Sequence, residues 1–135
     1  MVVYTRSYDW SLIKELRAMK LFDSELKVMN VLWREGEATA KHVSDVLKAS
    51  VGWNINTTYT ILKRLIEKGA VERSEPGFRC RPLVDKASVQ QQETDDLIDR
   101  VFDGSADKLF ASLLSRKKLS PEEIEGLKRL VDELE

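Results

Sequence analysis

The sequence predicts a mainly α fold with a small β wing, followed by a wholly helical region. Core-facing residues recur at helical spacing from Thr58 to Leu65, and Gly69 stands where a left-handed residue ends such a helix. Two short strands then flank a turn that contains Pro76 and Gly77. The remaining sequence shows helical patterns as far as the C-terminus.

Two further helices are predicted upstream of this one. Asp23 or Ser24 is expected to cap the first helix, and Thr39 is expected to cap the second. The segment 50–53 would then turn the chain into the third helix, which Asn54 would cap. Three helices followed by a hairpin define a winged helix-turn-helix.

The third predicted helix has a polar face opposite its core face. Recognition helices in the major groove use their N-terminal residues on bases, and Asn, Thr and Tyr side chains can all meet a base edge. For an isolated helix an ordinary solvated face would be the better interpretation, so the neighbouring wing decides in favour of DNA. The predicted base contacts are Asn56, Thr57, Tyr59 and Thr60.

The predicted wing has a basic character. Its strands are expected at 71–74 and 79–83, with the turn at 75–78 between them. A surface hairpin with scattered arginines is common, but a helix followed directly by a basic hairpin is rarer. The predicted phosphate contacts are Lys63, Arg64, Arg73, Arg79 and Arg81.

Charge divides the chain in the same way. The whole sequence of 135 residues has a net charge of −1, which says little by itself. Residues 1–83 hold 14 Lys and Arg against 10 Asp and Glu, whereas residues 84–135 hold 8 against 13. Because phosphate affinity depends on local cations, the acidic second half is not expected to lie on DNA.

The second half is predicted to form three short amphipathic helices. Asp85 and Ser105 are candidate N-caps, and Ser120 begins a Ser-Pro-Glu-Glu sequence typical of a capping box. Such helices cannot bury their apolar faces alone, so a second copy of the chain is the expected partner; folding back on the winged domain is the alternative. The predicted dimerisation residues are Leu97, Val101, Phe102, Leu109, Phe110, Leu113, Leu114, Ile124, Leu127, Leu130, Val131 and Leu134.

Three regions therefore follow from the sequence: an N-terminal extension at 1–20, a winged-helix DNA-binding domain at 21–84 and a helical dimerisation domain at 85–135. In the extension, Trp10, Ile13 and Leu16 are expected to form a short amphipathic helix; disorder of this segment is the alternative, and Met19 is an alternative start of the chain.

The composition argues against an enzyme. One His and one Cys cannot supply a zinc site or a nucleophile with its base, so no catalytic residue, metal or cofactor is predicted. His42 is expected at the surface, and Cys80 is expected to be a packed small side chain. No apolar run is long enough to span a membrane, so a cytoplasmic location is expected.

Three sequence blocks, taken in order, resemble the penicillinase repressor family (BlaI/MecI/CopY). The blocks are DSELKVMNVLWREGEATAKHVSDVL, NTTYTILKRLIEKGAVERSEPGFRCRPLV and FDGSADKLFASLLSRKKLSPEEIEGLK. The resemblance implies a homodimeric transcriptional repressor that binds a palindromic DNA operator. Several members carry basic residues at the positions of Asn56 and Tyr59, so the operator sequence and the target genes do not transfer.

The resemblance also bears on regulation. Copper-responsive members carry C-terminal cysteines, and this sequence has none after Cys80. Other members are inactivated by a regulatory protease at an Asn-Phe bond, whose place is taken here by Ser112 and Leu113. The inducing signal therefore does not transfer. A winged-helix protein-interaction module without specific DNA binding is the alternative function, and a gel shift on the chain's own upstream DNA distinguishes the two.

Overall fold

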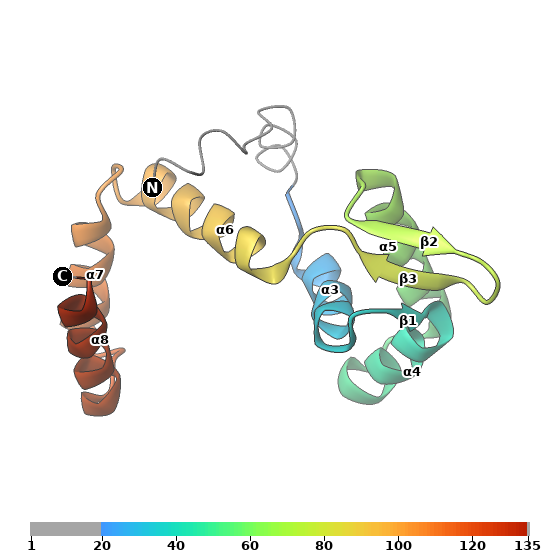
Figure 1. The fold of residues 1–135 in the computed structure, drawn as a ribbon, viewed down its shortest axis with the longest axis horizontal. Coiled ribbons are helices and arrows are strands. Elements are labelled where there is room, and N and C mark those ends of the chain that lie inside the picture. The colour runs from blue at the N-terminus through green and yellow to red at the C-terminus, as the bar shows by residue number, and fades with distance from the viewer. Residues whose placement is uncertain (1–19, 135) are drawn as a thin grey trace. The chain divides into compact units, whose positions relative to one another are not determined.

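The computed structural model describes residues 20–134, which divide into two compact units (Figure 1). The first unit extends to Gln92 and the second begins at Glu93, so the division falls inside helix α6 (Lys86–Val101). The helix expected near Trp10 lies outside the described residues.

The first unit is a winged helix-turn-helix, as predicted (Figure 1). It contains the helices α3 (Asp23–Glu35), α4 (Ala40–Val51) and α5 (Ile55–Lys68). Their apolar faces meet in one core, in which Met29, Leu32 and Leu62 are completely buried. The core continues into the sheet through Val71 and Cys80, so the helices and the wing share one interior.

The sheet has one strand more than predicted. The expected hairpin is present as β2 (Val71–Ser74) and β3 (Arg79–Pro82). A two-residue strand, β1 (Ala38–Thr39), pairs antiparallel with β3 and gives the order β1-β3-β2. A segment this short has no alternation to detect, because its strand character comes from pairing with residues about forty positions away.

Several predicted helix ends are confirmed. The Thr39 hydroxyl accepts the His42 amide at 3.1 Å, and the Asn54 side chain accepts the Thr57 amide at 2.9 Å. Gly69 ends α5 in the left-handed region with φ 83°. The turn expected at 50–53 is shorter than predicted, because α4 continues to Val51.

The start of α3 corrects the prediction, since neither Asp23 nor Ser24 is the cap. Phe22 occupies the cap position, and its amide donates to the carboxylate of Glu25 at 2.8 Å. Glu25 is completely buried and also accepts a hydrogen bond of 2.6 Å from Lys68 Nζ. The helix therefore begins without a polar cap side chain, and a residue 43 positions away pairs with the buried carboxylate.

The second unit contains the end of α6, α7 (Ala106–Ser115) and α8 (Pro121–Glu133). Asp103 and Gly104 interrupt the helices with positive φ angles of 54° and 77°. Ser105 occupies the N-cap position of α7 but makes no capping hydrogen bond through its side chain. Ser120 and Glu123 form the predicted capping box, with reciprocal hydrogen bonds of 3.1 and 2.9 Å.

None of residues 93–134 is buried. The helices α7 and α8 carry apolar stripes, yet Phe110, Leu114 and Val131 remain exposed. Among the described residues, no helix is long and apolar enough to cross a membrane.

Candidate nucleic-acid interface

Helix α5 presents a polar face to solvent because its other face is in the core. Thr58 and Leu65 are completely buried. Asn56 and Thr60, nearly opposite them on the helix, are exposed, whereas Thr57 and Tyr59 are half-buried. The structure therefore brings all four predicted base-reading residues to the first two turns of one helix.

The N-cap engages one of these four side chains. Asn54 Oδ1 accepts the Thr57 amide at 2.9 Å and also accepts the Thr57 hydroxyl at 3.2 Å. The Thr57 hydroxyl thus donates its hydrogen bond within the protein, and its oxygen can still accept a hydrogen bond from an external donor. Asn56 and Thr60 make no hydrogen bond through their side chains to other described residues, so both can donate and accept.

Tyr59 contacts the wing through an aromatic residue that the sequence analysis did not select. Its ring meets the Phe78 ring edge to face, with the centroids 5.5 Å apart. The Phe78 carbonyl accepts the Ala40 amide at 2.9 Å, so the same residue touches both helices of the helix-turn-helix. The signal in the sequence that could have identified it is an aromatic residue at the end of the predicted turn, between Gly77 and Arg79.

The three wing arginines do not share one face of the sheet. Side chains alternate along a strand, so Arg73 lies on the same face as the buried Val71 and Cys80. Arg79 and Arg81 lie on the opposite face.

Each wing arginine is paired with a carboxylate of this chain. Arg73 Nε lies 2.6 Å from Glu75, and Arg79 Nη2 lies 2.7 Å from Glu37. Arg81 Nη2 lies 2.6 Å from Glu72, its direct partner across the strands, and this hydrogen bond raises the pKa of Arg81. In the free protein the predicted phosphate contacts of the wing are therefore already occupied.

The two predicted phosphate contacts on the recognition helix differ from those of the wing. Lys63 and Arg64 are exposed on α5, and neither has an ion-pair partner within 20–134. Their charges are consequently available to a phosphate without the loss of an existing pair.

His42 and Cys80 take the places predicted for them. His42 is exposed and lies 2.8 Å from the carboxylate of Glu35. Cys80 is completely buried, and its burial raises the pKa of the thiol to about 11. Within the described part of the chain, no group of His, Cys, Asp and Glu side chains is arranged to hold a metal ion.

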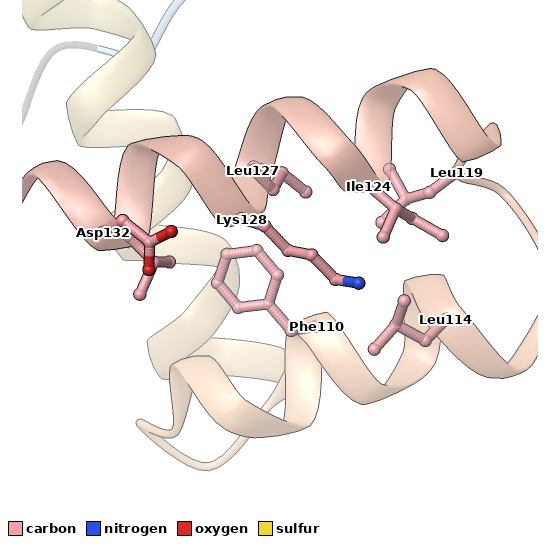
Figure 2. A pocket seen from close by; sticks show the side chains of 8 residues that line it. Phe110, Leu114, Leu119, Ile124, Leu127, Lys128 and Asp132 are labelled. Atoms are coloured by element: carbon pink, nitrogen blue, oxygen red, sulfur yellow. The ribbon is translucent and has the colours of Figure 1, made fainter.

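The second unit contains an apolar groove of about 490 Å³ between α7 and α8. Figure 2 shows Phe110 and Leu114 projecting from α7 toward Ile124, Leu127 and Lys128 of α8. Of the predicted dimerisation residues, five are half-buried: Phe102, Leu109, Leu113, Ile124 and Leu127. The other seven are exposed: Leu97, Val101, Phe110, Leu114, Leu130, Val131 and Leu134.

The sequence of these elements matches a known family. The model of the family described as penicillinase repressor matches residues 21–133, which include the recognition helix, the wing and the C-terminal helices. The chain belongs to the penicillinase repressor family. The match therefore spans both units that the structure describes.

The sequences of two relatives are similar to this chain over most of its length. The methicillin resistance regulatory protein MecI of Staphylococcus aureus (strain N315) is 24% identical over 118 residues, which cover 86% of this chain and 96% of MecI. The penicillinase repressor of Bacillus licheniformis is 28% identical over 116 residues, which cover 84% of this chain and 91% of that protein.

Two solved structures are similar to the chain, and the first of them shares its fold. The oxidised form of MarR from E. coli has a TM-score of 0.50 and 19% identity, covering 90% of this family member and 80% of MarR. The DNA-binding domain of the repressor BlaI has a TM-score of 0.48 and 32% identity, covering 51% of this chain and 87% of that domain.

Proposed function

We propose that the protein is a transcriptional repressor that binds a palindromic operator as a homodimer and reads bases with Asn56, Thr57, Tyr59 and Thr60. The observation that carries this proposal is the exposed polar face of α5 in a winged helix of the penicillinase repressor family. Short side chains at the start of the helix let it approach the major groove closely, where Asn and Thr distinguish base edges.

The phosphate contacts of this proposal fall into two groups. Lys63 and Arg64 are free of ion pairs among the described residues and would bind the backbone beside the groove. Arg73, Arg79 and Arg81 would bind it either by exchanging a glutamate for a phosphate or through the N–H groups that the glutamate leaves free. Both groups position the protein on DNA without reading its sequence.

The homodimer is proposed from the unburied second unit. Its apolar side chains have no core within residues 93–134, and the groove between α7 and α8 leaves Phe110 and Leu114 exposed to a partner. A second copy presents the same apolar stripes, so an isologous interface would bury both sets at once. Two recognition helices related by this symmetry would fit two half-sites of a palindrome.

Selection of genomic fragments with the purified full-length protein tests DNA recognition. We expect recovered fragments to share an inverted repeat and to bind at least about 1000-fold more tightly than a random duplex. The binding constant should fall steeply with salt concentration. If no fragment binds better than the random duplex, the protein-interaction module becomes the better assignment.

Two alanine variants then test the reading residues on the recovered operator. Asn56→Ala and Thr60→Ala should each cost about 1–3 kcal/mol of binding free energy and relax the base preference at one position per half-site. Asn30→Ala removes an exposed asparagine from α3 instead and is the matched control. Each variant is then measured on operators that carry single-base changes. If the Asn56 and Thr60 variants bind every one of these operators with the same affinity as the Asn30 variant, the assignment is refuted.

The regulatory protease implied by the family resemblance stays a prediction. Ser112 and Leu113, which replace the cleaved pair, are half-buried within α7. Cleavage there would cut one wall of the apolar groove and therefore act on the proposed dimer.

A further inference from the structure

The wing holds one arginine in an unusual setting. The Arg73 guanidinium carbon lies 3.6 Å from the centroid of the Phe78 ring, so the cation is stacked on an aromatic face. Its Nε donates a hydrogen bond of 2.6 Å to Glu75 Oε2. These two contacts fix the position of the guanidinium rather than leaving it to move freely in solvent.

This setting lies beside the recognition helix. Phe78 touches Arg73 on one side and meets the Tyr59 ring of α5 on the other. Tyr59 in turn lies one turn from Asn56 and next to Thr60. Phe78 therefore links Arg73 to the face of α5 that would approach DNA, and Arg73 is the wing cation joined to α5 by these contacts.

Glu75 accepts a hydrogen bond from Arg73 that a phosphate would otherwise accept. Carboxylate and phosphate oxygens are both strong acceptors for the guanidinium N–H groups, so one arginine edge serves one of them at a time. The hydrogen bond from Arg73 also holds the pKa of the Glu75 carboxyl below its ordinary value, which keeps this acceptor negatively charged.

We propose that Glu75 is an internal competitor for DNA: it holds the Nε–H of Arg73 in the free protein and yields this donor to a backbone phosphate when the wing binds. Phe78 keeps the guanidinium in place during the exchange, because its contact involves the ring face and not the hydrogen-bonding edge. Glu75 thus lowers the affinity for all DNA sequences equally and acts as a positioning residue through Arg73. This inference rests on the proposed DNA binding.

The other face of the hairpin provides a matched comparison. Glu72 pairs with Arg81 at 2.6 Å, the same distance as in the pair of Glu75 and Arg73. Both glutamates are exposed and lie in the same hairpin. Glu72, however, lies on the face opposite Arg73 and away from the Phe78 and Tyr59 contact. Substituting either residue changes the net charge equally, so a difference between the variants reports position.

The test measures binding of the full-length protein to a labelled random-sequence duplex by fluorescence anisotropy at low salt. We expect Glu75→Gln to bind at least about threefold more tightly than the wild type. Glu72→Gln, which releases Arg81 on the face away from Tyr59, should gain less than about twofold. In the background of Arg73→Ala, adding Glu75→Gln should change the affinity by less than about twofold, because the contested cation is gone. Thermal unfolding of each variant checks that the fold is retained.

Three results would overturn the inference. Glu75→Gln fails to tighten binding, Glu72→Gln tightens it equally, or the gain persists without Arg73. Because the random duplex contains no operator, these results are independent of sequence-specific recognition. A protein that selects no operator yet shows the gain at Glu75 would refute the proposed repressor and leave this inference standing.

Discussion

Every buried apolar side chain that the structure describes lies between Leu21 and Val84, whereas the helices at 93–134 bury none. Both regions contain a capped helix start, at Asn54 and at Ser120, and both contain amphipathic helices. The difference is therefore whether the apolar faces are covered. Three helices and a sheet cover one another's apolar faces in the first region, whereas the end of α6, α7 and α8 leave theirs uncovered. Good local helix signals alone do not make a self-sufficient unit.

The largest expected effect breaks the enclosed core. Leu62→Ala removes a completely buried side chain of α5 and should lower the free energy of unfolding by about 2–5 kcal/mol. Hydrogen exchange followed by mass spectrometry should show faster exchange throughout 21–84, at every protein concentration. An effect that disappears at high protein concentration would mean that the first unit also depends on a partner.

A second variant addresses the unenclosed helices. Leu114→Asp places a charge on the exposed apolar groove and should weaken self-association at least about 100-fold, as measured by sedimentation equilibrium. Leu83→Asp makes the same change at an exposed leucine of the first unit and should leave association unchanged. Equal sedimentation of both variants and the wild type would contradict the proposed interface.

The pH dependence of the first unit gives a smaller effect. Burial raises the pKa of the Cys80 thiol from 9.0 to about 11, so the folded state favours the neutral thiol. This contribution is complete below pH 9, where the thiol is neutral in both states, and is lost as the pH rises toward 11. At pH 10 the wild type should have lost about 1 kcal/mol relative to its stability at pH 8.

Denaturant titrations at both pH values measure this loss, with Cys80→Ala as the control. The alanine variant lacks the thiol and should show a correspondingly smaller decrease. If the decrease is the same in both proteins, other groups are responsible for it.

The smallest expected effect comes from removing an N-cap hydrogen bond, which can be done once in each unit. Asn54→Ala removes the cap of α5 and should cost about 1 kcal/mol in the unfolding of the first unit. Ser120→Ala removes the cap of α8 and should speed hydrogen exchange in 121–133 while leaving 21–84 unchanged. Faster exchange in α3 or α5 of the Ser120 variant would show that the two units are not independent.

Local features of the fold were predictable from the sequence, whereas those that depend on distant partners were not. Thr39, Asn54 and Ser120 cap helices as expected because the donor and acceptor lie within one turn. The start of α3 is an exception among the local features, because the Glu25 carboxylate accepts the Phe22 amide and no polar side chain stands at the cap position. Strand β1 was missed because its pairing partners lie about forty residues away.

The candidate site divides similarly. Helical periodicity placed Asn56 and Thr60 on the exposed face of α5, and the structure agrees. The wing arginines were predicted as one basic set, but strand alternation separates Arg73 from the other two. Glu37 is 42 residues from Arg79 and could not be assigned to it before the strands were paired, whereas Glu75 is only two residues from Arg73.

The indole of Trp33 in α3 donates a hydrogen bond of 2.8 Å to the carbonyl of Val84, at the point where the chain leaves the sheet for α6. A shift of Val84 would break this bond and admit water to the ring. The indole emission would then move to longer wavelength, so in a variant that lacks Trp10 and Trp53 the protein carries its own optical reporter of movement at that junction.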